Sequence, residues 1–183
     1  MSTERRTAAI IGCGDIAHHH VTGYQREGVE LIAFVDPLPA ARNQFISEYG
    51  TGKAYASLAD MFTELKPDLI SVCAWHLLHA PLTVEAAAGG VQGIICEKPM
   101  AVELRCADDM VRVCSERGTV FCCGSVYSGA PYLRQTLDWV EEGHLGRITG
   151  AAIPGGLPHE VAGGGCVQLT ILRLLTGLEV EWV

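Results

Sequence analysis

Two glycines near the N-terminus have the spacing of a phosphate-binding turn. The apolar run Ala8 to Ile11 is followed by the motif Gly12-x-Gly14-x-x-Ala17 and a helix-like segment. Gly12 permits a tight turn, Gly14 lets a pyrophosphate approach the backbone, and Ala17 allows a helix to pack closely on a strand. The phosphates would bind at the helix N-terminus, where unpaired N–H groups and the helix dipole favour an anion. The motif alone leaves a purely structural turn open.

An acidic residue follows the second apolar run, Leu31 to Val35, at the distance that a dinucleotide-binding motif requires. Asp36 would accept hydrogen bonds from the adenosine ribose and repel a 2′-phosphate, which favours NAD over NADP. Arg42 lies close enough in the sequence to leave NADP open. The alternative for Asp36 is a turn that opens before Pro37.

A lysine follows another apolar run, Gly93 to Cys96, in the sequence Glu97-Lys98-Pro99. The carboxyl edge of an open parallel sheet is where ligands bind. There, Lys98 could donate a hydrogen bond to a substrate oxygen beside a nicotinamide, and Glu97 could fix its position. The alternative is an ion pair before a turn.

The elements that must position these residues alternate along the chain. Short apolar runs separated by helix-like stretches predict an α/β fold with a doubly wound parallel sheet of the Rossmann type. The expected strands are Ala8 to Gly12, Leu31 to Val35, Leu69 to Ala74, Gly93 to Cys96 and Val120 to Cys123. The expected helices are Ile16 to Arg26, Leu38 to Tyr49, Leu58 to Leu65, Leu82 to Ala88, Leu104 to Arg117 and Pro131 to Glu142.

We predict a nucleotide-binding domain over 1–125 and a shorter second part over 126–183, because the alternating pattern changes after the helix that ends at Gly143. The second part would consist of the linking helix and a short remnant of an α/β domain, with strands over Arg147 to Ile153 and Val180 to Val183 and a helix over Val167 to Leu175. Strands with too few partners in the chain tend to recruit another chain. A homo-oligomer is therefore expected.

Composition excludes several classes of protein. The chain has 183 residues, a net charge of −8 and no Lys/Arg cluster beyond Arg5-Arg6, which argues against a nucleic-acid partner. The apolar runs are too short to span a bilayer, so we expect no membrane partner and a cytoplasmic location.

Consecutive residues His18 to His20 cannot converge on one ion from a helix, and no metal site is expected. Five cysteines lie in or beside strand-like runs and should be buried free thiols: Cys13, Cys73, Cys96, Cys122 and Cys123.

The order of these motifs resembles the Gfo/Idh/MocA oxidoreductase family. The glycine motif is followed by Asp36-Pro37, by Lys66-Pro67-Asp68, by the segment Cys73 to His79, and by Glu97-Lys98-Pro99. The resemblance implies an NAD-dependent dehydrogenase that transfers a hydride between nicotinamide and a carbinol or carbonyl carbon of a sugar, cyclitol or related polyol.

The resemblance also implies roles for particular residues. Lys98 corresponds to the family's substrate-binding and catalytic lysine, and His79 would lie near the nicotinamide ribose as a second catalytic candidate. The expected NAD-binding residues are Gly12, Gly14, Asp15, Ile16, Asp36, Cys73, Ala74, Trp75, His79, Glu97, Lys98 and Pro99.

Two departures from the family pattern bear on catalysis. Aligning Arg173 with the family's arginine puts Val167 and Thr170 where a proton-transferring His-x-x-Asp pair is usual. Lys98, His79, Tyr127 and His159 are then the possible acids or bases. The sequence also stops soon after this helix, so much of the family's substrate-covering sheet would be absent.

The alternative function is an NAD-binding protein with impaired catalysis, or the nucleotide-binding half of a longer gene.

Overall fold

The computed structural model describes residues 5–124, 129–159 and 164–177. It divides into one compact unit over Met1–Cys123 and a second over Gly124–Val183. The strands are β1 (Thr7–Ile11), β2 (Glu30–Val35), β3 (Lys53–Tyr55), β4 (Leu69–Val72), β5 (Gly93–Cys96) and β6 (Val120–Cys123). The helices of the first unit are α1 (Asp15–Arg26), α2 (Pro39–Tyr49), α3 (Leu58–Glu64), the short 3₁₀ helix η1 (His76–Leu78), α4 (His79–Ala88) and α5 (Leu104–Arg117).

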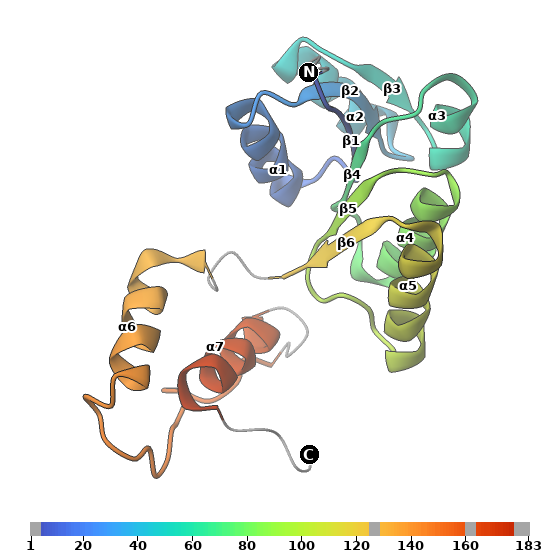
Figure 1. Ribbon diagram of the computed structural model, residues 1–183. Coiled ribbons are helices and arrows are strands. Elements are labelled where there is room, and N and C mark those ends of the chain that lie inside the picture. Colours follow the sequence, from blue (N-terminus) through green and yellow to red (C-terminus); the bar gives the residue numbers. More distant parts are fainter. Residues whose placement is uncertain (1–4, 125–128, 160–163, 178–183) are drawn as a thin grey trace. The chain divides into compact units, whose positions relative to one another are not determined.

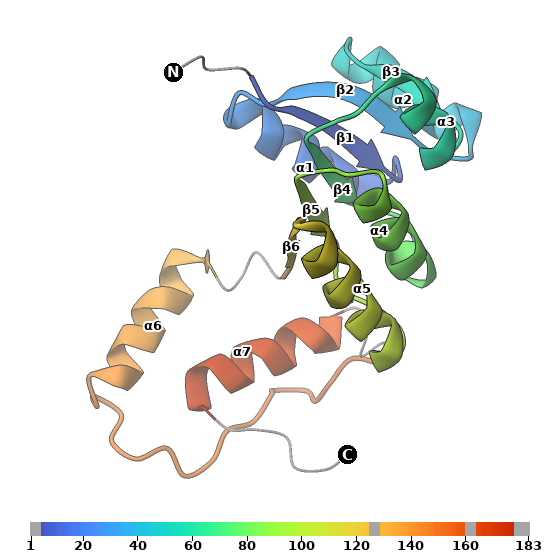
Figure 2. The same cartoon turned by 45° about the vertical axis from the view of Figure 1, so that its right-hand side comes forward.

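All six strands form one parallel sheet in the order β3-β2-β1-β4-β5-β6, which confirms the doubly wound Rossmann fold. The strand order reverses between β1 and β4, so helices cover both faces of the sheet. Figures 1 and 2 show α1 on one side of the strands and α4 and α5 on the other. The reversal also opens the crevice where ligands bind in such sheets.

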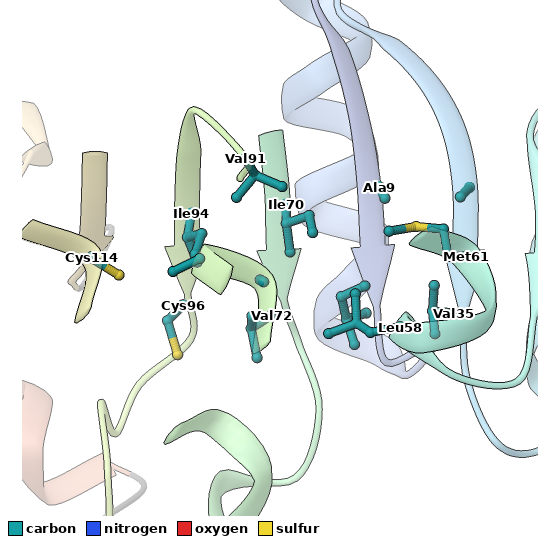
Figure 3. Close-up of a cluster of buried hydrophobic side chains, with 14 of the residues drawn as sticks. Ala9, Val35, Leu58, Met61, Ile70, Val72, Val91, Ile94, Cys96 and Cys114 are labelled. Carbon is teal, nitrogen blue, oxygen red and sulfur yellow. The ribbon is translucent and has the colours of Figure 1, made fainter. Parts of the chain in front are cut away.

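The side chains of β1 alternate between the two faces of the sheet, which explains why the first unit has two hydrophobic clusters. Ala8 and Ile10 pack with residues of α1 and α2, whereas Ala9 and Ile11 pack with residues of α3, α4 and α5. Successive side chains of a strand point to opposite faces, so a strand covered on both faces is apolar at every position. Figure 3 shows part of the second cluster, in which Leu58 and Met61 of α3 lie against Ala9 and Val35.

The structure also has a strand that the sequence analysis missed. Strand β3 has three residues, Lys53, Ala54 and Tyr55, of which only Tyr55 is buried. It pairs with β2 at the edge of the sheet. A single buried side chain produces no recognisable periodicity, so the sequence predicted no strand here.

The expected burial of Cys122 is wrong because β6, like β3, lies at an edge of the sheet. Phe121 and Cys123 pack against the core on the α4 and α5 face, whereas Val120 and Cys122 alternate to the other face and are exposed. The remaining four cysteines of that group are buried or half-buried free thiols.

The second unit contains α6 (Pro131–Glu141) and α7 (Cys166–Thr176) in its described part. Residues 147–153 do not form the predicted strand. They are mostly exposed, with Gly150 in the middle, and no described strand lies beside them to complete a backbone ladder. The expected strand Val180 to Val183 lies outside the described residues. The oligomer prediction therefore loses one of its two supporting strands.

Candidate functional site

The carboxyl ends of four strands bring most of the predicted site residues to one edge of the sheet. The backbone ladder continues one residue past β1, β4 and β5. Gly12 N–H donates to Val35 O at 2.8 Å, Cys73 N–H to Ile11 O at 2.7 Å, and Glu97 N–H to Val72 O at 3.0 Å. The glycine turn, the segment after β4 and the lysine turn after β5 thus start from a shared framework.

The glycine turn depends on two glycines for different reasons. Gly12 has a positive φ of 89°, and a Cβ there would lie 2.7 Å from the Ala74 nitrogen. Nothing lies within 4 Å of a Cβ built on Gly14, which caps α1 at its N-terminus. The first glycine is required by the fold, whereas the second leaves open space beside a helix N-terminus. Such a space suits a pyrophosphate.

Asp36 is half-buried and ties the end of β2 to the glycine turn. Its carboxylate accepts hydrogen bonds from Cys13 N–H at 2.9 Å and from Leu38 N–H at 2.8 Å. The Arg42 guanidinium donates to the carbonyl oxygens of Asp36 and Pro37, at 2.8 and 3.0 Å. The negative group is therefore fixed beside the turn, and at least one nitrogen of Arg42 is occupied by the backbone.

The thiols of this edge are packing groups. Burial raises the pKa of Cys13 to about 12, with a smaller contribution from the Asp36 charge. Burial also raises the pKa of Cys73, and the nearby Glu97 charge adds to the effect. Since the thiolate is the reactive form, neither cysteine is a nucleophile near neutral pH.

The lysine turn is held by its glutamate. The Glu97 carboxylate accepts hydrogen bonds from His20 Nε2 and from the Lys98 N–H, both at 3.1 Å. The hydrogen bond from His20 lowers the pKa of Glu97 more than any other interaction, and the Lys98 N–H adds to it. Glu97 is therefore ionised at neutral pH. The Lys98 residue is exposed, and its peptide bond to Pro99 is cis.

His79 is buried at the start of α4. It is the first residue of α4 and is 1% exposed. Its Nδ1 lies 2.7 Å from Pro99 O and its Nε2 lies 3.0 Å from Ala74 O. Because both ring nitrogens face backbone carbonyls, this geometry favours a tie between two loops over proton exchange with a substrate.

The remaining predicted residues of this edge are exposed or half-buried. Asp15 and Ile16 open α1 and are exposed, and Ala74 is half-buried. Trp75 is 64% exposed, and its ring centroid lies 4.3 Å from that of His76. An exposed indole is available to contact a ligand that lies along this loop.

Part of the site was not predicted from the sequence. His20, Ser71 and Tyr24 were not among the predicted site residues, although all three are connected to Glu97 by hydrogen bonds. A serine in the apolar run Leu69 to Val72 was the available signal, because a buried hydroxyl requires a hydrogen-bond partner.

The second unit holds the residues predicted to stand in place of a proton-transferring pair. Val167 and Thr170 lie on α7, where the Thr170 hydroxyl donates to Cys166 O at 2.7 Å. His159 is exposed, and Tyr127 lies outside the described residues. Over 5–124, 129–159 and 164–177, no group of three or more His, Cys, Asp or Glu side chains is placed to hold a metal. In the same ranges no helix has the length and apolar character to cross a bilayer.

Comparison with known proteins decides the family. The model of the Gfo/Idh/MocA group, described as an oxidoreductase family with an NAD-binding Rossmann fold, matches residues 6–125. The chain belongs to this family. Its NAD-binding domain has the fold and the cofactor type that the motifs predicted.

Among curated Gfo/Idh/MocA-type relatives, the chain is 29% identical to a D-glucoside 3-dehydrogenase of Escherichia coli over 81% of its own length and 42% of the relative. It is 28% identical to a 1,5-anhydro-D-fructose reductase of Ensifer adhaerens, over 79% of the chain and 43% of the relative. The chain thus spans less than half the length of these relatives.

Solved structures show the same relation. The WlbA dehydrogenase of Bordetella pertussis, in complex with NADH and UDP-GlcNAcA, superposes with a TM-score of 0.73 at 25% identity. That match covers 79% of this chain and 44% of the other. The scyllo-inositol dehydrogenase of Lactobacillus casei superposes with a TM-score of 0.82 at 18% identity, over all of this chain and 61% of the other, which shows the shared fold.

Proposed function

We propose that this chain provides the NAD-binding and lysine-bearing part of a dehydrogenase that acts on a sugar, cyclitol or related polyol. The observation that carries the proposal is the shared sheet edge, which connects the glycine turn, Asp36 and the Glu97-Lys98 turn through backbone hydrogen bonds. The sugar class is supported by the relatives' names, which include a glucoside dehydrogenase and an anhydrofructose reductase.

The residues present fit a dinucleotide. Gly14 leaves space for a pyrophosphate at the N-terminus of α1, and the fixed carboxylate of Asp36 can accept hydrogen bonds from ribose hydroxyls. When bound, NAD supplies the hydride acceptor. Trp75 and Ala74 would line the loop that runs beside it.

Lys98 would act on the substrate. An ammonium group at this edge can donate a hydrogen bond to the reacting hydroxyl or carbonyl oxygen and stabilise negative charge that develops there. Glu97 holds the backbone of Lys98 through its carboxylate and is itself held by His20. His79 would keep the Ala74 and Pro99 loops together and would not exchange a proton.

A second function is favoured by one observation. The Thr170 hydroxyl donates to its own helix, and aligning Arg173 with the family's arginine would put Val167 and Thr170 at the positions of the proton-transferring pair. Without that pair, this chain would bind NAD and turn over little or no substrate by itself.

Steady-state turnover with a panel of polyols and sugars, combined with NADH titration by fluorescence, tests both functions. Lys98→Ala should lower turnover by about 10²-fold, as expected for loss of a general acid or base, and leave NADH affinity within about twofold. Lys66→Ala removes an exposed lysine outside this edge and serves as the matched control. A fully active Lys98→Ala variant would remove Lys98 from the mechanism, and NADH binding without turnover would support the second function.

A further inference from the structure

Four polar side chains form a hydrogen-bonded row through the core on the α1 side of the sheet. Tyr24 OH lies 2.9 Å from Ser71 Oγ, Ser71 Oγ lies 2.9 Å from His20 Nδ1, and His20 Nε2 lies 3.1 Å from Glu97 Oε1. Ser71 is completely buried and Tyr24 is 7% exposed. The row ends at the Lys98 N–H, which donates to the other Glu97 oxygen.

When His20 is neutral, only one assignment of hydrogen-bond donors and acceptors satisfies every group of the row. An ionised carboxylate accepts only, so His20 Nε2 must carry the proton that faces Glu97. His20 Nδ1 is then an acceptor and takes the Ser71 proton, and the freed Ser71 oxygen takes the Tyr24 proton. Tyr24 and Ser71 thereby select the tautomer in which His20 can bind Glu97.

A row of this kind costs more free energy than packing alone requires. Placing hydroxyls and a histidine in an apolar core costs free energy that their mutual hydrogen bonds recover only when every member is satisfied. Neighbouring positions on the same core face, such as Ile10 and Phe34, are apolar. Ser71 is a completely buried polar residue on this face, and it lies on the path that leads to Glu97.

We propose that His20 is a positioning residue for Lys98, acting through the Glu97 carboxylate, and that Tyr24 and Ser71 hold His20 in the tautomer this requires. The importance of Lys98 for chemistry rests on the proposed function, whereas the positioning itself does not. His20 lies on α1, whose N-terminus forms the glycine turn, so the row also connects the expected dinucleotide site to the lysine turn.

A pair of amide substitutions at His20 separates this role from simple packing. The nitrogen of a glutamine side chain reaches the place of Nε2, so His20→Gln retains a donor for Glu97. An asparagine reaches only the place of Nδ1, so His20→Asn loses that donor. The two amides are similar in polarity, so a packing role predicts similar behaviour for both.

Amide hydrogen exchange by NMR on the full chain provides the measurement. His20→Asn should speed exchange at the Lys98 amide by about tenfold relative to His20→Gln, which should stay close to wild type, because one hydrogen bond to a charged group is lost. Exchange at the core amide of Ile10 should be unchanged in both. Equal exchange at Lys98 in the two variants would overturn the proposal.

A measurement on the unmodified chain remains informative if a variant fails to fold. The ring nitrogen chemical shifts of His20 should show a proton on Nε2, and Tyr24→Phe combined with Ser71→Ala should reduce the population of that form. A bare Nε2 in the wild type would overturn the proposal. NADH titration of the same samples is read separately, because loss of NADH binding in the wild type would reject the proposed function without changing the exchange result.

Discussion

The glycine turn and the lysine turn lie at the same edge of the sheet, but backbone geometry defines the first and side-chain hydrogen bonds define the second. The glycine turn is shaped by backbone, and Gly12 leaves no room for even a Cβ beside the Ala74 nitrogen. The lysine turn is shaped by side chains, with Glu97 held between His20 and the Lys98 N–H. Substitutions should therefore act through steric clash at the first turn and through lost donors and charges at the second.

The largest expected effect is on folding at Gly12. Gly12→Ala should lower the free energy of unfolding by about 2–5 kcal/mol, because a positive φ costs an L-residue about 1–2 kcal/mol and the clash with Ala74 adds about 1–3 kcal/mol. Urea denaturation measures this. Gly14→Ala is the matched control, with a change of about 1 kcal/mol or less, because its Cβ meets nothing and only the helix cap is affected. Equal losses in the two variants would contradict the distinction.

The next effect separates binding from folding at the same turn. Gly14→Val should leave a folded chain and weaken NADH binding by about a hundredfold or more, since the branched side chain fills the space expected for the pyrophosphate. Calorimetric titration and a thermal unfolding curve of one sample measure both quantities. NADH affinity within twofold of wild type would mean that the motif is only a structural turn.

A smaller effect concerns the choice of cofactor at Asp36. NADP should bind about tenfold more weakly than NAD, because a phosphate beside this carboxylate costs about 1.4 kcal/mol. Arg42→Ala should leave the ratio of the two affinities within about twofold, since Arg42 donates to backbone carbonyls. Titration of both proteins with both cofactors tests this. Equal affinities in the wild type would reject the role of Asp36.

The smallest effect is the acid sensitivity of the lysine turn. The pKa of Glu97 is lowered in the folded chain, chiefly by His20, so its ionised form contributes stability above the ordinary value of 4.5. That contribution is lost as the pH falls from this value through the lowered pKa. Glu97→Gln and His20→Asn should each reduce the loss of unfolding free energy between neutral pH and acid, as measured by urea titrations. If both variants lose as much unfolding free energy in acid as the wild type does, ionised Glu97 does not contribute this stability.

Self-association stays a prediction. Of the two strands that supported it, residues 147–153 are not a strand and Val180 to Val183 lie outside the described residues. Light scattering at micromolar concentration measures the mass in solution. A monomer would contradict an assembly through this part of the chain.

Local patterns determined the framework of the first unit. Strands β1, β2, β4, β5 and β6 were recognised because each is an apolar run, as is typical of parallel strands, and the helix Leu104 to Arg117 was predicted at its observed bounds. The glycine motif, Asp36 and Lys98 were recognised because their roles depend on what immediately precedes them in the chain. Strand β3 was missed because its three residues bury one side chain, and pairing with β2 alone defines it.

Only the tertiary structure decided how the side chains are partnered. The sequence determined that a lysine follows a strand and that a histidine lies on the first helix, yet Lys98 and His20 are far apart in the chain. Parallel pairing of β4 and β5 puts Ser71 opposite Ile95, close to Glu97, and His20 of α1 forms hydrogen bonds with both Ser71 and Glu97. The same long-range packing buries His79 between two backbone carbonyls, a setting that the family resemblance did not reveal. Hydrogen-bond partners that are distant in sequence carry no local periodicity, so only the folded chain defines them.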